Sequence, residues 1–233
     1  VAALYFHFMR IDPQNPHWPD RDRFIMSKGH ACTVWYAALA ERGFFPREAL
    51  GTLRRMGSIL QGHAYMHKTP GIDISTGSLG QGLSNGIGMA LAGKYYKKGY
   101  RVYVIIGDGE SQEGEIWEAA MAAPKWKLDN LTAFLDRNHL QNDAPTIEIM
   151  PLEPLADKWR AFNWNVIEID GHNMREIVWA IETAQQTKGK PTLIFAHTIK
   201  GKGVSFMENV AKWHGTAPNE EEAEQALREI GEV

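Results

Sequence analysis

The sequence contains little cysteine, little net charge and no long apolar run, and each of these shortages excludes a class of protein. A single cysteine, Cys32, excludes an internal disulfide framework and fits a reducing compartment, so we predict a cytoplasmic protein. The 25 basic and 28 acidic residues leave a net charge of −3, which offers no basic surface to nucleic acid or an anionic membrane. No apolar run approaches the roughly 18 residues that cross a bilayer. The composition therefore favours a globular protein without a nucleic-acid or membrane partner.

Short apolar runs alternate with helical patterns over the second half of the chain. The predicted strands are 101–106, 131–135, 165–169 and 191–199, and the helices between them are 113–123, 152–162 and 174–187. This alternation predicts an α/β fold, a parallel sheet with helices on both faces. Further helices are expected at 31–42, 46–56, 82–98 and 220–230. We see no linker in 233 residues and predict a single domain, 1–233. The first residues already have a helical pattern without a capping residue, so we expect an earlier part of the domain to precede Val1.

Asp108 and Asn138 are separated by thirty residues, the length of one β–α–β unit. Such a unit returns the chain to the same edge of a parallel sheet, where ligands bind beyond the carboxyl ends of the strands. The glycines of Gly107-Asp108-Gly109 permit a tight turn, and the following helix would point its N-terminus at an anion. Asp108, Asn138 and a carbonyl near Leu140 are oxygen donors that suit magnesium, which commonly shares phosphate oxygens. We therefore predict a metal-bridged diphosphate here. The alternative is that Asp108 only caps the helix and Asn138 lies in a turn.

A second pattern recurs every fourth residue in "STGSLGQGLSNGIGMALAGKYYKKG", where Gly82, Gly86 and Ala90 form a smooth stripe on one helix face. Glycine inside a helix costs about 0.5–1 kcal/mol relative to alanine, so a close neighbour must offset that cost. The neighbour is either a helix of a second protomer or an element of this same domain. The sequence leaves both open.

Three of the nine histidines lie in glycine-flanked turns, where a functional site would expose them: His30, His63 and His214. By residue type alone, a structural role is the more common one for each. Lys200 and Lys202 follow a predicted strand end and are placed to meet a phosphate, although a solvated basic loop is the ordinary alternative.

Four segments together resemble the N-terminal, diphosphate-binding part of transketolases. They are "DRFIMSKGHA", "STGSLGQGLSNGIGMA", "GDGESQEGEIWEAA" with the later "LDRNHLQND", and "KGKGVSFMENVAKWHG". They follow the family's order from Asp22 to Gly215. Glycine-aspartate-glycine with a distant asparagine is shared by thiamine enzymes in general. "SKGHA" and "GSLGQG" narrow the resemblance to transketolases rather than deoxyxylulose-phosphate synthases or pyruvate dehydrogenases.

The resemblance implies a thiamine diphosphate-binding fold that transfers a two-carbon ketol group from a ketose phosphate to an aldose phosphate. It implies that Asp108, Asn138 and the Leu140 carbonyl bind Mg²⁺ (or Ca²⁺). The implied cofactor-binding residues are His30, Gly77, Ser78, Leu79, Gly109, Asn138, Lys200 and His214. The implied catalytic residues are His30, His63, His214 and Glu113, the last in an acidic network near the interface between active sites.

Two features depart from the family's pattern. A "GHPG"-like segment with a further active-site histidine lies upstream of the region that resembles "VAALYFHF" in the family, and it is absent here. Transketolases also continue into a pyrimidine-binding domain whose glutamate activates the cofactor, and this sequence ends before one. We therefore expect the N-terminal subunit of a split transketolase, with a partner subunit that carries the pyrimidine-binding domain and two copies of each chain (α2β2).

Other functions stay open at this point. A non-catalytic, thiamine diphosphate-binding regulatory module would keep the same pocket. Another thiamine enzyme subunit, such as a deoxyxylulose-phosphate synthase-like one, would share the metal motif. An α/β protein with a nucleotide site would bind ATP, and thiamine diphosphate would not change its thermal stability.

Overall fold

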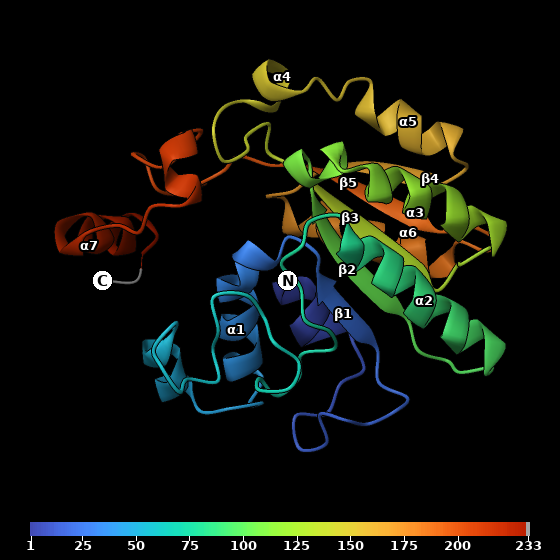
Figure 1. Ribbon diagram of the computed structural model, residues 1–233, viewed down its shortest axis with the longest axis horizontal. Helices are drawn as coiled ribbons and strands as arrows, with labels where there is room; N and C mark the ends of the chain where they lie inside the picture. Colours follow the sequence, from blue (N-terminus) through green and yellow to red (C-terminus); the bar gives the residue numbers. More distant parts are fainter. Residues whose placement is uncertain (232–233) are drawn as a thin grey trace.

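A five-stranded parallel sheet forms the centre of the computed structural model, which describes residues 1–231 (Figure 1). Its strands are β1 (Arg23–Met26), β2 (Val102–Gly107), β3 (Leu131–Arg137), β4 (Asn165–Asp170) and β5 (Thr192–His197). They are arranged in the order β1-β2-β3-β5-β4, and every neighbouring pair is parallel. The predicted fold class is confirmed. Among the described residues, no helix has the length and apolar character that a membrane crossing requires.

Helices cover both faces of the sheet because side chains alternate along each strand. From β2, Val102, Val104 and Ile106 join one apolar cluster, and Tyr103 joins the other. The first cluster contains α2 (Gln81–Tyr95), α3 (Gly114–Lys125) and α5 (Leu155–Ala161). The second contains α1 (Cys32–Glu41) and α6 (Met174–Gln186). Figure 1 shows α2 and α3 lying together across the same face of the sheet.

Several predicted elements differ from the structure. Strand β1 was not predicted, because its four residues are too short to show a period. The helix expected at 46–56 is a shorter 3₁₀ helix, Arg47–Thr52, and Pro46 precedes it in an extended conformation. The short helix α4 (Thr146–Ile149) was not expected either. The helix expected at 220–230 is α7 (Glu220–Glu229), which begins with a capping box formed by Asn219 and Glu222.

The small-residue stripe of α2 packs inside this domain. A Cβ atom added to Gly82 would lie 2.7 Å from Cα of Ser27, and one added to Gly86 would lie 2.6 Å from a methyl group of Val104. Ala90 is fully buried in the same cluster. The stripe therefore lets α2 approach β1 and β2 closely, and of the two alternatives the structure supports packing within the domain.

Candidate active site

A cavity of about 210 Å³ lies at the carboxyl edge of the sheet, where the segments that follow β1, β2, β3 and β5 meet. Its position agrees with the rule that open parallel sheets bind ligands beyond their carboxyl ends. Most of the predicted site residues line it: His30, Leu79, Asp108, Gly109, Glu113, Asn138, Leu140, Lys200 and His214. Residues that are spread from position 30 to position 214 of the chain thus share one cavity.

Three predicted site residues, His63, Gly77 and Ser78, do not line this cavity but lie beside it. A Cβ atom on Gly77 would be 3.1 Å from the ring of His63, so the two residues are in contact. A Cβ atom on Gly29 would be 2.8 Å from the backbone nitrogen of Gly77. The loop that carries these residues therefore packs directly against the segment that positions His30.

The carboxylate of Asp108 is buried and already accepts three hydrogen bonds from its own chain. Oδ1 accepts from the backbone N–H of Gly109 at 2.7 Å. Oδ2 accepts from Nη1 of Arg137 at 2.9 Å and from the backbone N–H of His139 at 2.6 Å. Asp108 is therefore a cap, but of the short 3₁₀ helix Gly109–Gln112 rather than of the helix predicted at 113–123, whose N-cap residue is Glu113. Through Oδ2, Asp108 is hydrogen-bonded to Arg137 and His139, the residues on either side of Asn138.

The same residues retain the capacity to hold a cation. A carboxylate has about four lone-pair sites, so Asp108 keeps one for a metal. The side-chain oxygen of Asn138 accepts one bond, from Leu140 N at 3.1 Å, and also keeps a free lone pair. No cluster of three or more His, Cys, Asp or Glu side chains of metal-binding geometry occurs within residues 1–231. This donor set, with a single carboxylate, fits magnesium, which binds through one or two carboxylates together with phosphate oxygens.

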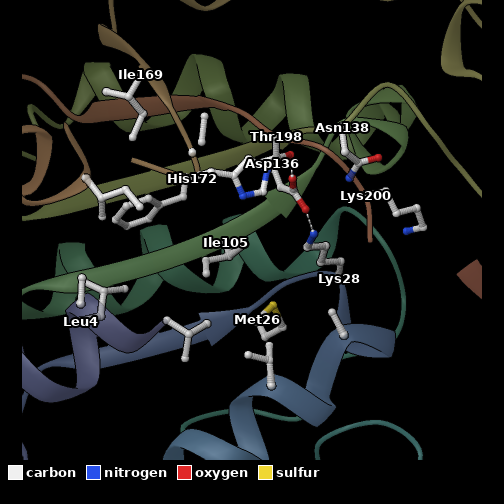
Figure 2. A pocket seen from close by; sticks show the side chains of 18 of the residues that line it. Leu4, Met26, Lys28, Ile105, Asp136, Asn138, Ile169, His172, Thr198 and Lys200 are labelled. Carbon is white, nitrogen blue, oxygen red and sulfur yellow. Dashed lines mark hydrogen bonds and ion pairs between the residues drawn. The ribbon is translucent and has the colours of Figure 1, made fainter. Parts of the chain in front are cut away.

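Two lysines add positive charge to the cavity. Lys28 forms an ion pair with Asp136, which also accepts a hydrogen bond from Thr198. Lys200 makes no ion pair with the described residues, and burial and the nearby Lys28 lower its pKa. Figure 2 shows Lys28, Asp136 and Thr198 at the polar end of an adjoining, largely apolar cavity of about 410 Å³. Lys28, Asn138 and Lys200 line both cavities.

His30 and His214 face each other in the cavity, with ring centroids 4.9 Å apart. Burial, followed by the charges of His214, Lys28 and Lys200, lowers the pKa of His30 from 6.5 to about 4. Burial and the same two lysines also lower the pKa of His214. Nδ1 of His214 is buried and has no hydrogen-bond partner among the described residues. Both rings are therefore neutral near pH 7, and an unused ring nitrogen remains for a ligand.

The shift of His30 predicts a pH-dependent stability. Because the folded pKa lies below the unfolded value of 6.5, the unfolded chain binds more protons between pH 6.5 and about 4. We expect the free energy of unfolding to fall as pH decreases through this window and the His30 contribution to level off below it. NMR titration should place the His30 midpoint near 4, and His30→Asn should make the pH dependence shallower. A midpoint near 6.5 would contradict the prediction.

Sequence reasoning missed three residues that shape the site: Lys28, Glu110 and Arg137. Lys28 and Glu110 lie inside recognisable motifs, "SKGH" and "GDGE", but their partners are distant in sequence. Arg137 is the last residue of β3; with Asp136 it follows the largely apolar stretch 131–135 and directly precedes Asn138, which was a visible signal. It is buried and joins Asp108 to Glu153 and Thr146.

Comparisons with known proteins agree with this geometry. A family model described as "Transketolase, thiamine diphosphate binding domain" matches residues 1–232. SqwG, a 6-deoxy-6-sulfo-D-fructose transketolase subunit of Clostridium sp. (strain MSTE9), is 54% identical over 99% of this chain and 84% of its own length. An apulose-4-phosphate transketolase subunit of Phocaeicola vulgatus is 49% identical over 100% of this chain and 82% of its own length. Human transketolase is 43% identical over 99% of this chain but only 36% of its own length.

The solved structure of transketolase from Leishmania mexicana has the same fold. It superposes with a TM-score of 0.92 at 33% identity, covering 99% of this chain and 36% of that one. These relatives are transketolases or their subunits, and they do not favour a regulatory module, a deoxyxylulose-phosphate synthase-like chain or a nucleotide-binding protein. The family model, these relatives and the cavity built by the shared motifs show that this chain belongs to the transketolase family, as its N-terminal, thiamine diphosphate-binding part.

Proposed function

We propose that residues 1–233 act as one diphosphate-binding domain and as the N-terminal subunit of a two-chain, cytoplasmic transketolase. A separate chain would supply the pyrimidine-binding domain, in an assembly with two copies of each chain. The observation that carries the proposal is the cavity in which Asp108, Asn138 and Lys200 meet two neutral histidines at the carboxyl edge of the sheet. Two relatives at about half identity, which this chain covers over more than four-fifths of their length, are named as transketolase subunits and support the two-chain assembly.

Asp108, Asn138 and the carbonyl oxygen of Leu140 would hold the magnesium ion. The backbone of Gly109, together with Lys200, would bind the diphosphate, and the segment Gly77–Leu79 would pass beside the cofactor rings. When bound, thiamine diphosphate supplies the electron sink that allows a carbon–carbon bond of the ketose to break. The protein's own contribution is to position the reactants and to exclude water from the cavity.

The histidines would hydrogen-bond hydroxyl groups of the sugar and accept or donate protons. A neutral imidazole both donates and accepts a hydrogen bond, so His30 and His214 can hold a hydroxyl or take up a proton without first losing one. The low pKa of His30 keeps its ring in this state at neutral pH. His63, beside the Gly77 loop, would bind hydroxyls of the two-carbon fragment, and Glu113 would belong to the acidic network between active sites.

The decisive experiment combines this chain with a chain that carries the pyrimidine-binding domain. The chain alone should bind thiamine diphosphate with magnesium but show no two-carbon transfer from xylulose 5-phosphate to ribose 5-phosphate, and the mixture should turn over. One relative is named for 6-deoxy-6-sulfo-D-fructose and another for apulose 4-phosphate, so donors with a sulfonate and with a phosphate should both be assayed. Robust turnover by the lone chain would refute the two-chain assembly. Cofactor binding without turnover in any mixture would support a regulatory module instead.

A further inference from the structure

Glu110 is a buried carboxylate of the cavity that has no place in the proposed binding or catalytic set. It is 3% exposed and follows Asp108 by two residues, in the short 3₁₀ helix Gly109–Gln112. Oε1 accepts from the backbone N–H of Gly80 at 2.9 Å and is in hydrogen-bond contact with Oγ of Ser27. Oε2 accepts from the backbone N–H of Gly107 at 2.9 Å. One side chain thus binds three donors.

These three donors belong to three different segments of the site. Ser27 directly precedes Lys28 and the turn that carries His30. Gly80 directly follows the segment Gly77–Leu79, and Gly107 directly precedes Asp108. The contacts of Glu110 span 83 residues to Ser27 and 30 residues to Gly80. A single carboxylate therefore connects the histidine turn, the glycine loop and the metal-binding turn.

Both side-chain oxygens of Glu110 act as acceptors in these contacts. Both oxygens of an ionised carboxylate accept hydrogen bonds, whereas an amide of the same shape presents one oxygen and one NH₂ group. An amide at position 110 would therefore direct a donor at the N–H of Gly80 or of Gly107. A buried donor left without an acceptor costs about 1–3 kcal/mol, and the chain relieves that cost by moving one of the segments.

The glycine loop is sensitive to such a movement because it is built from closely packed backbone. Gly77 has φ of +149° and Gly80 has φ of +88°, conformations that side-chain-bearing residues rarely adopt. The backbone of Gly77 also packs directly against Gly29. A shift at Gly80 should therefore also move the backbone of the adjoining segment Gly77–Leu79, which lies beside the cavity.

We infer that Glu110 is a positioning residue that holds the three cofactor-binding segments in register, so that replacing it weakens thiamine diphosphate binding far more than it weakens the fold. The inference rests on the proposed function. It assigns to the carboxylate no contact with the cofactor or the substrate.

The test compares Glu110→Gln with a matched variant, Asp22→Asn. Asp22 is also a buried carboxylate that accepts from two backbone N–H groups of separate segments, Arg10 and Arg101, both at 2.8 Å. It lies at the amino ends of β1 and β2 and lines neither described cavity. The two substitutions should therefore lower the free energy of unfolding by similar amounts, but only Glu110→Gln should affect the cofactor site.

Three quantities would be measured on the full chain: the free energy of unfolding, the Kd of thiamine diphosphate with saturating Mg²⁺, and amide hydrogen exchange. Loss of a group that hydrogen-bonds a metal ligand typically costs 10–100-fold in affinity. Glu110 acts one residue away, through Gly107 beside Asp108, so we expect a loss on the order of tenfold for E110Q. E110Q should also speed exchange at Gly80 and Gly107. D22N should lower stability comparably and leave the Kd and those two amides unchanged.

The outcomes separate this inference from the proposed function. If E110Q binds thiamine diphosphate with the wild-type Kd, Glu110 has no positioning role. The same conclusion follows if D22N and E110Q show the same loss of affinity for an equal loss in the free energy of unfolding. If the wild-type chain does not bind thiamine diphosphate with Mg²⁺ at all, the proposed function fails, and the inference fails with it.

Discussion

Replacing Asp108 by alanine should reduce magnesium-dependent thiamine diphosphate binding by more than about 100-fold, because the diphosphate loses its bridging cation. Loss of an outer partner of a metal ligand already costs roughly 10–100-fold, and Asp108 is proposed as a direct ligand. The fold should survive, since Arg137 keeps Glu153 and Thr146 as partners. We expect the free energy of unfolding to fall by about 3–5 kcal/mol, because the buried Arg137 loses one of its carboxylate partners and two backbone N–H groups lose their acceptor. Calorimetric titration of the cofactor with and without Mg²⁺ measures the first effect, and chemical denaturation measures the second.

Thr146→Val is the matched control for this experiment. Thr146 accepts a hydrogen bond from the same Nη1 atom of Arg137 at 2.9 Å and is fully buried, but it does not line the 210 Å³ cavity. Its loss should lower stability by roughly 1 kcal/mol and leave cofactor affinity unchanged. If the Asp108 variant bound the cofactor with wild-type affinity and the same Mg²⁺ requirement, the cation would have to bind elsewhere.

Replacing Gly82 by alanine should destabilise the protein strongly, although the same change is favourable in most helices. The new methyl group would lie 2.7 Å from Cα of Ser27, whose backbone is held to β2 by a hydrogen bond from Ser27 N to Ile105 O. Overpacking of this kind costs typically 1–3 kcal/mol and sometimes more, and the helix must move away from β1 to relieve it. Because Ser27 also contacts Glu110, we expect weaker cofactor binding as well. Chemical denaturation and cofactor titration measure the two effects.

Gly88→Ala in the same helix should have the opposite effect and raise the free energy of unfolding. Gly88 is exposed, and a Cβ atom there would have no neighbour within 4 Å. Replacing an exposed helical glycine by alanine is worth about 0.5–1 kcal/mol of stability. If Gly82→Ala stabilised the protein as much as Gly88→Ala, the stripe would not pack against β1 and β2. If the effect of Gly82→Ala appeared only at concentrations where the chain self-associates, the stripe would pack against another protomer.

The sequence alone was sufficient to predict the parallel sheet, four of its strands and the convergence of Asp108 and Asn138. These features depend on local information: the period of the apolar residues, and the length of a β–α–β unit, which brings consecutive strand ends to one edge. The resemblance to transketolases then indicated which other residues to expect around them, and most of those line one cavity.

Only the tertiary structure decided how these residues are held and charged. The bonds of Glu110 to Ser27 and of Lys28 to Asp136 join residues 83 and 108 positions apart, and no local pattern in the sequence reports such pairs. The low pKa of His30 likewise results from burial and from charges brought in by other segments. The sequence also did not decide what packs against the small residues of α2. Their neighbour is β1 together with β2, and β1 is too short to show a period in the sequence. Periodicity and spacing are properties of neighbouring residues, whereas hydrogen-bond partners, burial and local potential arise only when distant segments are packed together.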